Sequence, residues 1–373
     1  MTLGAQRSAT GRMQTGPQEC GEEMVTGNER HRHCVERELS RTGHDASLER
    51  RAARPVRPVA RCLPAWLCDD ATAAFRTPGR SSTGPMTKDN AMARHEYSAP
   101  LTGDARIVER PDGTRLRTFC AGTGPKTVLL AHGYGFGAWE WNLVEPQLVE
   151  RGFRVITFDQ RGHQGSSIGS DGINSAAMAS DYGAILEAYD VHDGILVGHS
   201  MGGFLSVAFL TETPGDAAKR LRGLILMATF AGGVSEKNPQ NRLQIPMIRL
   251  GVLQRLLRFG PVATGFTKSL TGDAFEPAMT PALTKLFLGS DHQQLIPILR
   301  AMVDEKRYDL LGSIDLPTTV IIGTKDATTP PFHSRQLHEG ITGSTFVSVE
   351  GMGHCLNWES PNTIVAEIEP LAD

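Results

Sequence analysis

Ile195-Leu196-Val197-Gly198-His199-Ser200-Met201-Gly202 joins an apolar run to a serine framed by glycines. An apolar run without polar alternation is typical of a strand buried on both faces of a sheet, and the apolar stretch 204–210 that follows favours a buried helix. A G-x-S-x-G pattern between a strand and a helix indicates a sharp turn, at which glycines allow close backbone approach. We therefore predict that Ser200 is an exposed nucleophile, beside a helix N-terminus that favours negative charge.

Further apolar runs alternate with helical stretches on both sides of this turn. Buried strands separated by helices predict a parallel, doubly wound sheet with helices on both faces. A hairpin formed by 106–109 and 114–120, with a turn at Pro111-Asp112-Gly113, comes before it. The predicted strands are 128–131, 154–158, 194–197, 224–227, 319–322 and 345–349, and the predicted helices are 176–189, 202–211, 332–338 and 362–371.

The chain divides into unequal parts. Residues 1–95 are rich in Arg, Gly, Pro, Ser and Thr and show no sustained apolar period, so we expect a disordered extension, or a natural start at Met86 or Met92. Residues 96–373 are expected to form the folded domain. Within it, residues 232–312 lack a clear strand and contain amphipathic stretches, which predicts a helical cap over the strand ends, where doubly wound sheets bind ligands.

Three more motifs each follow a predicted strand: Ala131-His132-Gly133-Tyr134-Gly135, the acid-containing loop 323–330, and Gly351-Met352-Gly353-His354. Together with the serine turn, they resemble the α/β-hydrolase superfamily, in its serine-hydrolase, esterase-like form with a helical cap. The resemblance implies an α/β-hydrolase fold and three catalytic residues: Ser200, Asp326 and His354. It also implies an oxyanion hole made by the backbone N–H groups of Tyr134 and Met201, and a structural role for His132.

This constellation predicts acyl transfer to water. His354 would accept the Ser200 proton, Asp326 would orient the ring, and water would release the acid from an acyl-enzyme. Serine at the nucleophile position excludes the superfamily's haloalkane dehalogenases and epoxide hydrolases, which use aspartate there. We expect an ester hydrolase for a small, largely apolar substrate. A lactonase, a C–C hydrolase or a cofactor-free perhydrolase or haloperoxidase on the same triad remains open, as does a ligand-binding receptor with little or no turnover.

Apolar cap residues either line the substrate pocket or simply pack helices together. The residues in question are Ile245, Met247, Ile248, Leu250, Leu253, Leu256 and Leu257.

Composition sets the remaining expectations. Of 373 residues, 40% are hydrophobic and 21% charged, as in an ordinary soluble globular protein. The net charge of −3 gives no whole-chain reason to expect nucleic acid or an anionic membrane as partner. We expect a small-molecule substrate, no membrane insertion, and no cofactor or metal. Cys120 and Cys355 look like free thiols, which favours a reducing, cytoplasmic location.

Overall fold

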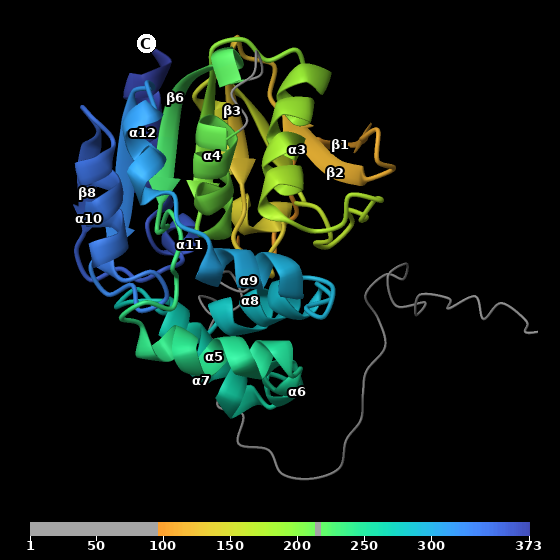
Figure 1. Cartoon of the computed structure of the whole chain (residues 1–373), viewed down its shortest axis with the longest axis vertical. Coiled ribbons are helices and arrows are strands. Elements are labelled where there is room, and N and C mark those ends of the chain that lie inside the picture. The colour runs from red at the N-terminus through yellow and green to blue at the C-terminus, as the bar shows by residue number, and fades with distance from the viewer. Residues whose placement is uncertain (1–95, 213–217) are drawn as a thin grey trace, which may run out of the picture. The chain divides into compact units, whose positions relative to one another are not determined.

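The computed structural model describes residues 96–212 and 218–373. The extension expected at 1–95, with its alternative starts at Met86 and Met92, lies outside the described residues. The described part contains an eight-stranded sheet in the order β1-β2-β4-β3-β5-β6-β7-β8 (Figure 1). Its strands are β1 (Asp104–Glu109), β2 (Arg115–Ala121), β3 (Lys126–Ala131), β4 (Phe153–Phe158), β5 (Gly194–His199), β6 (Leu221–Met227), β7 (Thr318–Gly323) and β8 (Thr345–Val349).

Strand pairing confirms the predicted fold class. β1 and β2 form the expected antiparallel hairpin, and β2 pairs antiparallel with β4. From β4 to β8 every pair is parallel. Every residue of the central strand β5 is buried, which explains its continuous apolar sequence. The sheet is thus mostly parallel, with the serine turn at the end of a central strand.

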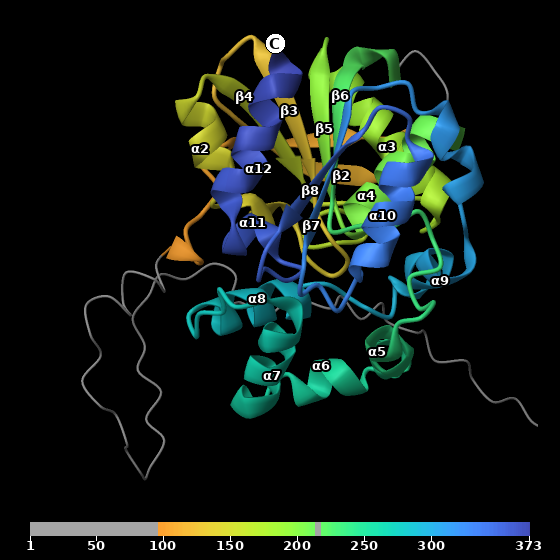
Figure 2. The same ribbon diagram turned by 90° about the vertical axis from the view of Figure 1, so that its left-hand side faces the viewer.

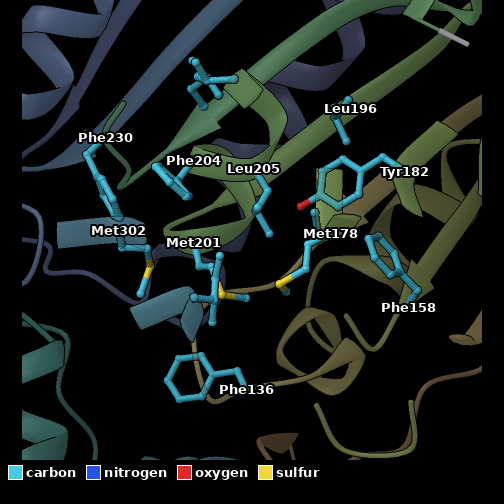
Figure 3. Close-up of a cluster of buried hydrophobic side chains, with 14 of the residues drawn as sticks. Phe136, Phe158, Met178, Tyr182, Leu196, Met201, Phe204, Leu205, Phe230 and Met302 are labelled. Atoms are coloured by element: carbon cyan, nitrogen blue, oxygen red, sulfur yellow. The ribbon is translucent and has the colours of Figure 1, made fainter. Parts of the chain in front are cut away.

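Helices cover both faces of this sheet (Figure 2). One face packs against α2 (Glu145–Glu150), α11 (Leu356–Glu359) and α12 (Pro361–Ile368). The other packs against α3 (Ser175–Ala188), α4 (Met201–Glu212) and α10 (Pro331–Gly340). Figure 3 shows Met178 and Tyr182 of α3 beside Leu205 of α4, in the cluster that anchors the helix following the serine. Short 3-10 helices are η2 (Ala138–Trp141), η3 (Ala218–Arg220), η4 (Tyr308–Ser313) and η5 (Glu369–Ala372).

Between β6 and β7 the chain forms a group of helices at the carboxyl ends of the parallel strands (Figures 1 and 2). The amphipathic stretch 245–259 is divided in two by Gly251, whose φ of 68° lies in the left-handed region that favours glycine. The helices are α5 (Pro239–Arg249), α6 (Val252–Leu256), α7 (Gly260–Leu270), α8 (Met279–Leu288) and α9 (Ile296–Asp304). No helix of the described residues has the length and apolarity needed to cross a membrane.

Candidate active site

Ser200 sits between β5 and α4 in a strained backbone conformation. Its φ of 54° lies in the left-handed region, which costs a non-glycine residue on the order of 1–3 kcal/mol. Hydrogen bonds hold this geometry: the Ser200 N–H donates to the Met227 carbonyl at 3.0 Å, and the Ser200 carbonyl accepts from the Gly203 N–H at 3.0 Å. The sharp turn expected from the sequence is therefore present at Ser200.

Two glycines of the turn are needed because other backbone lies against them. A Cβ on Gly198 would come within 2.6 Å of the Gly203 Cα. A Cβ on Gly202 would come within 2.3 Å of the Ala131 carbonyl oxygen, at the end of β3. These close approaches bring the serine turn against the loop that contains His132, Gly133 and Tyr134.

Asp326 and His354 form a buried pair on the loops that follow β7 and β8. The His354 Nδ1–H donates to Asp326 Oδ2 at 2.8 Å, which leaves Nε2 as the ring nitrogen that can act as an acceptor. The carboxylate is itself oriented: Thr328 and Thr329 each donate a backbone N–H to Oδ1 at 2.8 Å. The Thr329 hydroxyl donates to Oδ2 at 2.7 Å. The sequence motifs did not identify these two threonines as partners of the acid.

Ser200 and His354 line one cavity, and Asp326 contacts the His354 ring without lining that cavity itself. Within residues 96–212 and 218–373, no hydrogen bond joins Ser200 Oγ to the His354 ring. In enzymes without bound substrate such hydrogen bonds are often long and tighten only when the complex forms. The structure thus brings the three predicted catalytic residues to one end of the sheet, in the order expected.

The loop after β3 forms the opposite wall of the cavity, through Gly133 and Tyr134. In the described part of the chain, neither the Tyr134 N–H nor the Met201 N–H donates a hydrogen bond to another protein group. Both amides are therefore left without a protein acceptor among the described residues. The Gly133 N–H is held by the Glu140 carboxylate, at 3.2 Å from each oxygen.

Glu140 also holds His199, and this buried pair was not identified from the sequence. His199 Nδ1 lies 3.1 Å from Glu140 Oε1, and Nε2 lies 3.0 Å from the His354 carbonyl oxygen. Because both partners are acceptors, both ring nitrogens donate, which describes an imidazolium. Burial disfavours that charge, but the Glu140 carboxylate outweighs it and raises the pKa of His199. Glu140 precedes His199 by 59 residues, so no local motif could reveal the pair.

His132 also lies beside the site but, unlike His199, it is uncharged. Its Nδ1–H donates to the Gly133 carbonyl at 2.7 Å, and its Nε2 accepts the Gln160 backbone N–H at 2.8 Å. Burial lowers its pKa to about 3, so the ring stays neutral. With both nitrogens engaged by backbone groups, His132 fixes the loop after β3.

The cavity wall is mostly apolar and comes largely from the helices between β6 and β7. Ile245 and Ile248 of α5 line it, as two of the apolar residues singled out from the sequence. Leu250 does not: its side chain is 73% exposed, so the expectation that it lines a pocket or packs between helices is wrong. The other lining residues are Phe136, Phe230, Val234, Asn241, Gln244, Phe266, Leu270, Phe287, Leu299, Met302, Thr328 and Thr329.

Among the residues that the structure describes, no group of three or more His, Cys, Asp or Glu side chains is arranged to hold a metal ion.

The sheet order, the strained serine at the end of β5 and the helices inserted after β6 together define an α/β-hydrolase. Residues 128–368 match the model of the alpha/beta hydrolase family, and the chain belongs to that family. It is therefore an enzyme of the hydrolase class.

Individual relatives carry different activities. The chain is 30% identical over 268 residues to the 2-hydroxy-6-oxononadienedioate/2-hydroxy-6-oxononatrienedioate hydrolase of Paraburkholderia xenovorans, covering 68% of this chain and 89% of that protein. A thermophilic esterase from Thermogutta terrifontis is 25% identical, with a TM-score of 0.59 over 72% of this chain and all of that one. A bromoperoxidase from Bacillus anthracis has the same fold, with 24% identity and a TM-score of 0.63 over 72% and 99% of the two chains.

Proposed function

We propose that this α/β-hydrolase is a serine esterase that cleaves small, uncharged, largely apolar esters through an acyl-enzyme. Ser200 is the nucleophile, His354 its base and Asp326 the residue that orients the base. The observation that carries the proposal is the Asp326–His354 pair, which leaves His354 Nε2 as an acceptor in the cavity that Ser200 also lines.

The reaction follows from these positions. His354 takes the Ser200 proton as Oγ attacks the ester carbonyl, and the Tyr134 and Met201 N–H groups receive the oxyanion. His354 then gives its proton to the leaving alcohol. A water molecule activated by His354 hydrolyses the acyl-enzyme and returns the serine to its starting state.

The charge of the cavity supports esters over the substrate named for the Paraburkholderia relative. A dienedioate carries two carboxylates at neutral pH, and a site for it would be expected to offer cationic partners. No Arg or Lys is among the described residues that line the cavity, whose polar side chains include Asn241, Gln244 and Thr328. Transferring an unpaired carboxylate into this site would be costly. The free thiols of Cys120 and Cys355 support a reducing, cytoplasmic compartment as the place where this esterase works.

The test is hydrolysis of p-nitrophenyl esters of increasing acyl length by the wild type, Ser200→Ala and the control Ser313→Ala, which alters an exposed serine. We expect the wild type and the control to release p-nitrophenol and Ser200→Ala to be inactive. A p-nitrophenyl ester with a terminal carboxylate should be a much poorer substrate than its uncharged counterpart. Equal activity of Ser200→Ala and wild type would refute the nucleophile assignment, and preference for the carboxylate ester would refute the substrate class.

A further inference from the structure

Exposed apolar side chains are concentrated on three helices. Among the described residues, five of the seven large hydrophobic side chains that are exposed come from α5, α6 and α7 or the segments joining them. Leu250, Leu243 and Phe259 are 73%, 67% and 63% exposed, so they do not belong to any core. These helices lie together on the side of the α5–α9 group that is away from the sheet (Figures 1 and 2). The five residues are Leu243, Leu250, Val252, Phe259 and Val262.

The same helices carry an excess of positive charge. Residues 239–272 contain five basic side chains and no Asp or Glu. All five are exposed, and within the described ranges none of them forms a salt bridge. The rest of the chain after residue 95 contains 18 basic and 30 acidic residues, so the net charge of −3 conceals a local basic region. The five residues are Arg242, Arg249, Arg255, Arg258 and Lys268.

We call the ten side chains listed above the α5–α7 face. It adjoins the candidate active site, because two of the helices that carry it, α5 and α7, also line the cavity. A surface hollow that includes Arg242 and Arg249 shares Asn241 and Ile245 with the cavity wall. A partner bound to this face would therefore lie next to the cavity wall.

We propose that the α5–α7 face docks on an anionic lipid surface. Such a surface offers a partner to both kinds of side chain on the face. Its negative headgroups attract the basic side chains, and its acyl chains contact the apolar ones. Docking would be shallow, with the apolar side chains at the boundary between headgroups and acyl chains. The proposal concerns binding only and does not depend on which bond the enzyme cleaves.

Two partners from the chain itself match the face less well than a lipid surface does. Residues 1–95 contain 15 basic and 11 acidic residues, so this segment has the same sign of charge as the face. A second copy would supply acidic side chains, but outside the face the exposed large apolar residues of the described part are only Ile107 and Leu310. Pairing of two α5–α7 faces would bring ten positive charges together.

The experiment is co-sedimentation of the full chain with vesicles. One set is phosphatidylcholine alone, and the other has about a third of its lipid replaced by phosphatidylglycerol. We expect binding to the anionic vesicles only, weakened by high salt. Arg255→Glu/Arg258→Glu reverses two positive charges of the face, and Phe259→Asp replaces an apolar side chain by a carboxylate. Each variant should therefore weaken binding at least about tenfold. Arg335→Glu, which changes an exposed arginine on α10, is the matched control and should bind like the wild type.

Hydrolysis of a soluble short-chain ester by each variant shows that the fold and site are intact, because none of these residues lines the cavity. Three results would overturn the proposal. The first is no preference for anionic vesicles. The second is undiminished binding by both face variants, which would assign binding to another part of the chain. The third is a wild-type dimer that Phe259→Asp dissociates, without any vesicle binding, which would assign the face to a second copy.

Discussion

His199 Nε2 lies 3.0 Å from the carbonyl oxygen of His354, so the residue before the proposed nucleophile holds the backbone of the proposed base. The other ring nitrogen of His199 contacts Glu140, whose carboxylate also accepts the Gly133 N–H of the loop after β3. One buried ion pair therefore joins the three loops on which the proposed chemistry depends. Its members are 1% exposed or less, so its geometry is protected from water.

Glu140→Gln tests whether this pair positions the reacting groups. The substitution keeps the shape of the side chain but removes the charge that keeps His199 protonated. A displacement of about 1 Å in a reacting group can cost on the order of 10²-fold in rate, so we expect kcat to fall about 10- to 100-fold with KM little changed. Steady-state kinetics on a p-nitrophenyl ester measures both. Glu150→Gln, at an exposed position of α2, should have no effect, and an unchanged kcat in Glu140→Gln would contradict the positioning role.

Asp326→Asn tests the orientation of the base. An amide in this place can donate its N–H to His354 Nδ1, which would put the proton on Nε2 and remove the acceptor that faces the cavity. The expected loss in kcat is on the order of 10⁴-fold, the size found when the acid of a serine-protease triad is replaced in this way. Asp315→Asn, at an exposed position, is the control. A loss of less than about tenfold would mean that Asp326 is not the orienting acid.

The fold could be predicted from the sequence because its signals are local. Each parallel strand is a short apolar run, and the strained Ser200 turn is marked by glycines that backbone contacts require. The hairpin of β1 and β2 was likewise marked by its Pro111-Asp112-Gly113 turn. Such features depend on a few neighbouring residues, so one sequence is enough to show them.

The supporting contacts could not be predicted because they join residues far apart in the chain. The Glu140–His199 pair spans 59 residues, and its members are ordinary in their local context. The prediction for Leu250 was also wrong. This apolar residue directly follows α5 in an amphipathic stretch, but its side chain is exposed. Amphipathic periodicity shows that a helix has two faces, but it does not show what covers the apolar one.

Gly202→Ala and Gly265→Ala should change stability in opposite directions. A Cβ at Gly202 would lie 2.3 Å from the Ala131 carbonyl oxygen. The backbone of the turn could relieve this clash only by a shift that also moves Ser200. We expect a clear loss in the free energy of unfolding, together with loss of activity. Gly265 is an exposed residue of α7 with nothing within 4 Å of its would-be Cβ. Alanine there should stabilise the protein by about 0.5–1 kcal/mol, since glycine is the poorer helix former. Urea unfolding of both variants measures the difference, and a stable, active Gly202→Ala would contradict the role given to Gly202.

Acid should destabilise the protein through histidines that are buried without charge. Burial lowers the pKa of His333 to about 4, although Asp326 and Glu236 act in the opposite direction, and lowers that of His132 to about 3. In the unfolded chain both rings have a pKa of about 6.5, so below that pH the unfolded state binds more protons. The contribution of these two histidines to stability is therefore fully present above about pH 6.5 and is lost as the pH drops towards 4, by about 2 kcal/mol at pH 5 for His333 alone.

His333→Gln isolates this contribution. The substitution keeps a polar side chain beside the Tyr308 hydroxyl, which contacts His333 Nδ1 at 2.6 Å, but it cannot titrate. Urea unfolding at pH 7.5 and pH 5 gives the change in stability for each protein, and any fixed cost of the substitution cancels in that difference. We expect the loss between the two pH values to be about 2 kcal/mol smaller in His333→Gln than in the wild type. His338→Gln, on the same helix but partly exposed, should behave like the wild type. Equal losses in all three proteins would mean that His333 takes up its proton as easily in the folded state as in the unfolded one.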